Sequence, residues 1–229
     1  MKRFPITFVA AWVLSTLVCI EFIDRAASSW SFAHLHADRP VFDPLTHIVD
    51  KIPLLALITL AIVAVAAVWK GWKPTPVWRF GMCTAASVEL AIGFKEELKY
   101  ICGRTWPETW TNHNPSWIGN HVFTFSFFHG GEGWYSFPSG HMTIICALGA
   151  SLWLSSPQRR WLAILARSLA VLLPALVAIG LFGCDYHWVG DMCGGTFLGI
   201  ATANVVWRLY AKVQERGGAR GPHALSDAG

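Results

Sequence analysis

The chain has 229 residues, of which 54% are hydrophobic and only 14% are charged. Soluble domains have about a quarter of their residues charged, so this composition excludes an ordinary soluble domain and favours one membrane-embedded bundle. The formal net charge is +4. Because the basic residues lie mainly between apolar segments, this charge fits a membrane topology and gives no support for a nucleic-acid partner.

Six apolar segments are candidate membrane spans, since a span requires about 20 mainly apolar residues. They are residues 6–23, 53–69, 80–94, 141–154, 161–182 and 188–207. We therefore predict an all-α fold, a six-span transmembrane helix bundle. The first segment resembles a signal peptide, but it has no clear small-residue cleavage site and further spans follow, so we expect it to be retained. Residues 1–213 are predicted to form a single integral-membrane domain, and residues 214–229 a disordered cytoplasmic tail.

The distribution of Lys and Arg predicts the orientation, because cytoplasmic loops are enriched in both. With six spans, four basic groups fall on one side: Lys2 and Arg3; Lys70, Lys73 and Arg79; Arg159, Arg160 and Arg167; Arg208, Lys212, Arg216 and Arg220. We expect both termini to be cytoplasmic in the cell (inner) membrane. The opposite helix ends would then lie at the periplasmic or extracellular face.

Two predicted outer loops carry residues with more than one interpretation. In residues 24–51, the histidines could form a metal site, but interfacial histidines are the favoured reading. Residues 100–137 are rich in Trp and Phe, which is typical of an interfacial aromatic belt or of a lid that shapes a lipid entrance. Near the outer face, a disulfide among Cys102, Cys184 and Cys193 is possible in an oxidising compartment.

Three segments with chemical potential reach the same predicted face. The third span is followed by Lys99 and Arg104, the fourth begins at Pro138-Ser139-Gly140-His141, and the sixth begins at His187 and Asp191. Ionisable residues at membrane helices indicate function by default. A Ser-Gly step at a helix N-terminus can also bind an anion through backbone N–H groups.

This arrangement is suited to phosphoryl transfer. His187 and Asp191 are four residues apart and share a helix face, so Asp191 can orient the imidazole as a nucleophile. His141 could protonate the leaving oxygen. Ser139, Gly140, Lys99 and Arg104 could bind the phosphate oxygens. The alternatives are a pair of structural histidines, and for Arg104 an interfacial anchor.

These residues resemble the type 2 phosphatidic acid phosphatase family. That family has three motifs in this order. The first is Lys, any six residues and Arg-Pro, and the second is Pro-Ser-Gly-His. The third is Ser-Arg, any five residues, His, any three residues and Asp. In this chain the second motif is complete, and His187 and Asp191 match the end of the third. Lys99 is followed by Trp106-Pro107, and Gly180-Leu181 replaces Ser-Arg, so both family arginines are missing. The resemblance covers residues 95–199.

The resemblance implies a phosphohistidine on His187, orientation by Asp191, general-acid catalysis by His141, and phosphate binding by Lys99, Ser139 and Gly140. It implies no metal and no cofactor. Arg104, together with Lys95, is our candidate to replace the missing cationic charge.

Substrates would be lipid phosphates or pyrophosphates, hydrolysed at the outer membrane–water interface. A noncatalytic lipid-phosphate binder or transport component, and a lipid phosphotransferase, are the alternative functions.

Overall fold

A computed structural model describes residues 6–70, 75–110, 113–155 and 157–218 of the chain. The regular elements in these ranges are helices. They are α1 (Ile6–Val18), α2 (Asp24–Leu35), α3 (Arg39–Thr46), α4 (Ile52–Lys70), α5 (Pro76–Cys102), α6 (Trp117–Asn120), α7 (Gly140–Ser155), α8 (Arg160–Gly183) and α9 (Val189–Gly218). Short π- and 3-10-helical turns follow α1, α2 and α3.

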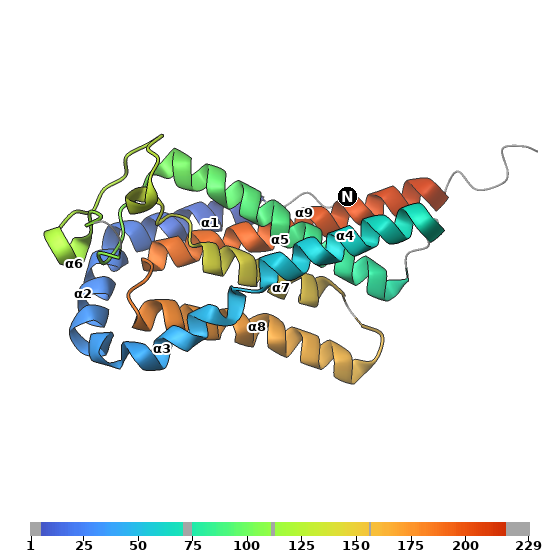
Figure 1. Cartoon of the computed structure of the whole chain (residues 1–229), viewed down its shortest axis with the longest axis horizontal. Helices are drawn as coiled ribbons and strands as arrows, with labels where there is room; N and C mark the ends of the chain where they lie inside the picture. The colour runs from blue at the N-terminus through green and yellow to red at the C-terminus, as the bar shows by residue number, and fades with distance from the viewer. Residues whose placement is uncertain (1–5, 71–74, 111–112, 156, 219–229) are drawn as a thin grey trace, which may run out of the picture.

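The predicted all-α bundle is confirmed. Helices α1, α4, α5, α7, α8 and α9 correspond to the six predicted spans and run along the long axis of the molecule (Figure 1). Three helical stretches are long and apolar enough to cross a membrane: Ile6–Trp69, Arg160–Gly183 and Val189–Arg216. The fourth predicted span, α7, is a shorter apolar helix. Its short length fits its position inside the bundle, where other helices rather than lipid surround it.

Helix α7 forms the centre of the bundle and packs against α5, α8 and α9. Glycines in α9 allow the closest of these contacts. A Cβ atom added at Gly195 would lie 2.5 Å from the Ser139 carbonyl oxygen, and one at Gly199 would lie 2.4 Å from the Thr143 carbonyl oxygen. Small residues of this kind let membrane helices approach closely. The contact fixes the beginning of α7 against the beginning of α9, where the candidate site residues lie.

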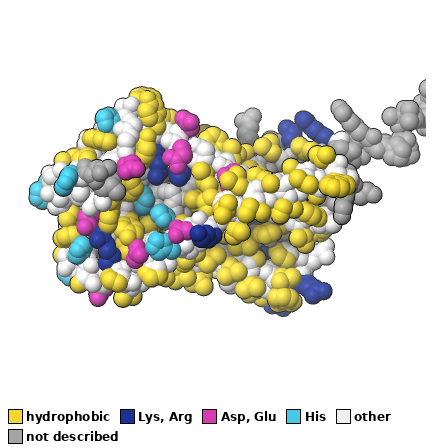
Figure 2. All heavy atoms as spheres, in the orientation of Figure 1, with side chains coloured by type: hydrophobic (Ala, Val, Ile, Leu, Met, Phe, Trp, Pro, Cys, Tyr) yellow, Lys and Arg dark blue, Asp and Glu magenta, His cyan; other side chains and the backbone are white. Residues whose placement is uncertain are grey.

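The outer surface divides into an apolar body and a polar end. Hydrophobic side chains cover the helix body in Figure 2, while charged and histidine side chains gather at the end that holds α2 and α6. Large apolar side chains such as Val68 (90% exposed) and Leu14 (65% exposed) lie on this body. Such exposure is costly in water and is expected in lipid, so the surface agrees with a membrane protein.

Two parts of the chain differ from the sequence-based expectation. Residues 24–51 contain α2 and α3, and α3 packs against α8. A Cβ atom added at Gly183 would lie 2.3 Å from Cγ of Phe42, so the glycine gives this helix pair its close contact. Helix α9 continues to Gly218, whereas the tail was expected to begin at residue 214. The rest of the predicted tail, residues 219–229, lies outside the described residues.

Candidate active site

The structure brings His141, His187 and Asp191 together at the polar end of the bundle. His187 lies in the turn between α8 and α9, Asp191 in the first turn of α9, and His141 in the first turn of α7. The ring centroids of the two histidines are 6.2 Å apart. Nδ1 of His187 lies 3.4 Å from Oδ2 of Asp191. Because an ionised carboxylate only accepts hydrogen bonds, Nδ1 carries the proton and Nε2 keeps its lone pair.

His187 is only 5% exposed, and this burial favours its neutral form. This burial lowers the pKa of His187, and the nearby charges of Lys99 and Arg104 act in the same direction, against the raising effect of Asp191. A neutral imidazole with an oriented lone pair is the form that acts as a nucleophile.

A pocket of about 460 Å³ opens beside the two histidines. Its walls also contain three aromatic side chains and one carboxylate: Trp106, Trp110, Tyr186 and Glu132. The Trp106 ring lies against His187 with 5.0 Å between ring centroids, and its Nε1 donates to the Glu132 carbonyl oxygen at 2.7 Å. Part of the aromatic outer loop therefore forms a wall of the pocket.

Two lysines supply positive charge near the pocket. Nζ of Lys99 lies 6.0 Å from the centroid of the Trp106 ring. A Cβ atom added at Gly140 would lie 3.4 Å from Nζ of Lys95, so this ammonium is next to the beginning of α7. Lys95 also pairs with Glu96 at 2.5 Å. The Gly140 backbone, which has no side chain to block a ligand, and the Lys95 ammonium thus lie together. This combination is suited to binding an anion.

Ser139 has a different environment from the predicted one. Its backbone N–H donates to the carbonyl oxygen of Asp191 at 3.0 Å, and its side chain is buried, with Oγ 3.5 Å from the Met142 nitrogen. These contacts join the beginning of α7 to α9. The Ser139 N–H is therefore occupied by protein, so Gly140 remains the better candidate of the two for contact with phosphate.

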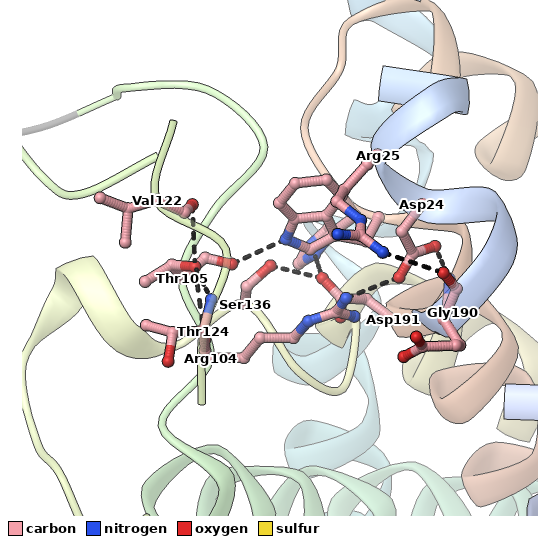
Figure 3. A network of polar contacts seen from close by, with 12 residues as sticks. Asp24, Arg25, Arg104, Thr105, Val122, Thr124, Ser136, Gly190 and Asp191 are labelled. Carbon is pink, nitrogen blue, oxygen red and sulfur yellow. Dashed lines mark hydrogen bonds and ion pairs between the residues drawn. The ribbon is translucent and has the colours of Figure 1, made fainter. Parts of the chain in front are cut away.

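Arg104 is also placed differently from the phosphate ligand that we expected. The residue is 1% exposed. Its guanidinium donates to Oδ1 of Asp191 at 2.5 Å and to Oδ2 of Asp24 at 2.6 Å (Figure 3). Asp24 also accepts the backbone N–H of Gly190 at 2.7 Å, and the Ser136 hydroxyl donates to Oδ2 of Asp191. Arg104 thus does not line the pocket and is fully engaged with two buried carboxylates.

Local structure explains why Arg104 points inward. Gly103 ends α5 with a φ of 52°, and a Cβ atom there would lie 1.8 Å from the Ser126 carbonyl oxygen. The chain therefore turns sharply, and three aromatic rings surround the guanidinium with centroids 4.9–5.2 Å from it: Phe123, Phe125 and Trp188. Aromatic faces stabilise a cation that is removed from water. The outer aromatic loop thus encloses this network as well as lining the pocket.

Sequence reasoning missed Asp24 and Ser136. Asp24 had a usable signal, since it is an acid directly after the first apolar segment. Ser136 had none, because a single serine in an aromatic loop has many possible roles.

The positions of the two missing family arginines offer no replacement cation. Trp106 stands against His187, and Leu181 is fully buried in the hydrophobic core. At Gly180, an added Cβ atom would lie 2.8 Å from the Leu45 Cβ atom, so α3 occupies the space that a larger residue would need.

The other predicted features near this end have ordinary partners. His47 contacts Asp50 at 2.8 Å and Asp43 at 3.2 Å, and His34 contacts the Trp30 carbonyl oxygen at 2.8 Å. In the described part of the chain, no group of three His, Cys, Asp or Glu side chains is arranged to hold a metal ion. All six cysteines are free, so the possible disulfide near the outer face is not formed.

The arrangement defines a helical membrane protein with a paired-histidine site at one end of its bundle. Residues 76–215 match the PAP2 superfamily, so the chain belongs to this superfamily. The fold is similar to the crystal structure of a transmembrane PAP2-type phosphatidylglycerolphosphate phosphatase from Bacillus subtilis. The TM-score is 0.60 at 18% sequence identity, over 89% of this chain and 96% of the other. A comparison with curated proteins gave no match.

Proposed function

We propose that this protein is a membrane phosphatase that hydrolyses a lipid phosphate or pyrophosphate monoester through a phosphohistidine. Superfamily membership supports a membrane lipid phosphatase in general. The observation that carries the finer proposal is the convergence of His187, Asp191 and His141 beside the 460 Å³ pocket.

In the first step, Nε2 of His187 attacks phosphorus. A P–N bond forms, the P–O bond to the lipid breaks, and His141 donates a proton to the departing lipid oxygen. The Asp191 carboxylate, 3.4 Å from Nδ1, stabilises the imidazolium that develops. In the second step, His141 takes a proton from water, the water oxygen attacks phosphorus, and the P–N bond breaks to release phosphate.

Charge on the phosphoryl oxygens is stabilised by Lys99, by Lys95 and by the backbone N–H of Gly140. Electrostatic stabilisation by preorganised donors contributes strongly to phosphoryl transfer. In this proposal Arg104 does not bind phosphate. It is a positioning residue that holds Asp191, and through Asp191 the ring of His187, in a fixed orientation.

The test is phosphate release by the purified full chain on a panel of lipid monophosphates and pyrophosphates, with a chelator present. His187→Ala should abolish release. His34→Ala is the matched control, because His34 is exposed and its ring contacts the Trp30 carbonyl oxygen and no residue of the proposed site. Release that is equal in wild type and His187→Ala would contradict the proposal.

A noncatalytic lipid-phosphate binder is a second candidate, favoured by the lack of a cation at positions 106 and 181. It predicts saturable binding of a lipid phosphate with no release across the panel. A phosphotransferase would release little phosphate until an acceptor lipid or sugar is added.

For location, we propose the cell (inner) membrane, with both termini cytoplasmic and the site at the periplasmic or extracellular face. The four basic groups on one side support this orientation.

A further inference from the structure

A second cavity lies at the opposite end of the bundle from the histidines. Its volume is about 590 Å³, within the range of about 300–1,000 Å³ that is typical of small-molecule sites. It is formed where α5 and α8 begin and where α7 ends, with Trp207 of α9 completing the wall. These helix ends lie at the right of Figure 1, away from α6 and the aromatic loop.

The cavity is amphipathic. Arg79, Arg159 and Gln158 supply polar groups, and no acidic side chain of the described residues lines the cavity. One face of α8 supplies an apolar wall through Leu162, Leu165, Ala166 and Leu169. Their spacing follows the helix repeat, so the wall extends along α8 away from Arg159 toward the middle of the bundle. A ligand with an anionic head and an apolar chain matches this order of groups.

The two arginines are available for an anion. Among the residues that the structure describes, neither Arg79 nor Arg159 forms an ion pair, and Arg79 lies 6.0 Å from the centroid of the Trp207 ring. Helix α8 has no acidic residue in its first turn and no side-chain cap at Arg159. The positive end of its dipole therefore adds to the attraction that the guanidinium groups exert on an anion.

We propose that this cavity binds an anionic phospholipid of the surrounding membrane. The headgroup phosphate lies between Arg79 and Arg159, and one acyl chain follows the apolar face of α8. Basic pockets between membrane helices recognise anionic headgroups in this way. The site is separate from the histidine pocket, and its occupation does not depend on the proposed hydrolysis.

The experiment is a titration of the full chain in detergent with phosphatidylglycerol, with bound lipids counted by native mass spectrometry. Phosphatidylcholine, which has no net charge, is the lipid control. The double variant Arg79→Gln, Arg159→Gln should bind phosphatidylglycerol about tenfold more weakly, the loss expected for two exposed charge–phosphate contacts. Arg160→Gln is the matched protein control, since Arg160 is adjacent in sequence but does not line the cavity.

A second variant tests the cavity rather than its charge. Leu165→Trp fills the apolar wall and leaves both arginines in place, so it should also weaken phosphatidylglycerol binding. Inorganic phosphate added in excess should compete poorly, because it lacks the chain. The proposal is overturned if Arg160→Gln weakens binding as much as the double variant. It is also overturned if Leu165→Trp leaves phosphatidylglycerol binding unchanged, or if phosphatidylcholine binds equally well.

Discussion

Replacement of Arg104 by lysine tests whether this buried cation positions Asp191 or binds phosphate. The guanidinium makes two charge-assisted hydrogen bonds, at 2.5 Å and 2.6 Å, to carboxylates that are both at most 1% exposed. A lysine keeps the charge, but its single ammonium cannot reproduce the planar fork that reaches Asp191 and Asp24 together. One ionic hydrogen bond is worth about 1.5–3 kcal/mol, which corresponds to a fall of between about tenfold and about 150-fold in rate.

The assay is steady-state phosphate release at varied substrate concentration. Arg104→Lys should lower kcat by about tenfold or more with KM nearly unchanged, since substrate contacts stay intact. Arg25→Lys is the matched control, because Arg25 is an exposed neighbour whose guanidinium contacts the Glu21 carbonyl oxygen. A raised KM with unchanged kcat would instead identify Arg104 as a phosphate ligand and refute the positioning role.

The buried charges also allow a thermodynamic test of the same network. Arg104→Ala leaves Asp24 and Asp191 without their shared cation, which should cost about 3–5 kcal/mol. Adding Asp24→Asn removes one of the two stranded charges, so the double variant should melt at a higher temperature than Arg104→Ala alone. Equal or lower melting temperatures for the double variant would show that Asp24 and Arg104 are not coupled.

Further outcomes follow from individual residues. Burial lowers the pKa of His187, so the nucleophile stays neutral in mild acid. The apparent pKa of the acid limb in the pH profile of kcat/KM should therefore lie below the ordinary histidine value of about 6.5. An apparent pKa above that value would contradict the assignment. Gly199→Ala should destabilise the chain by about 1–3 kcal/mol, since its Cβ atom would meet the α7 backbone, while Gly93→Ala, with no atom within 4 Å, should not; thermal melting compares the two. Trp106→Arg should strengthen inhibition by vanadate, because it restores a guanidinium next to His187; unchanged inhibition would count against a phosphate site there.

Much of the fold could be predicted from the sequence, because long apolar segments and the small residues that recur in them indicate membrane helices directly. The fourth predicted span, residues 141–154, agrees with α7 (Gly140–Ser155), and the fifth, residues 161–182, agrees with α8 (Arg160–Gly183). The helices α2 and α3 were not predicted. Helix α3 packs on α8 through Gly180 and Gly183, a tertiary contact that a local pattern does not encode.

The candidate site was predictable to the extent that motifs fix helix positions. Spacing indicated that His187 and Asp191 come together, and the topology indicated that His141 lies at the same end. The predicted shared helix face was wrong, because His187 lies in the turn before α9 and contacts Asp191 from there. The direction of Arg104 was not predictable, because it depends on the turn at Gly103 and on the partner Asp24, which is distant in the sequence. Charge identified the residue as important, while only the fold shows which carboxylates it contacts.

The central claim, a covalent phosphohistidine on His187, is tested most directly by rapid-quench labelling with a phosphate-radiolabelled lipid substrate. The account predicts an acid-labile, base-stable label on the wild-type chain. It also predicts that the label is absent in His187→Ala. A label that persists in His187→Ala, or rapid phosphate release by wild type with no labelled protein at any time, would contradict the account.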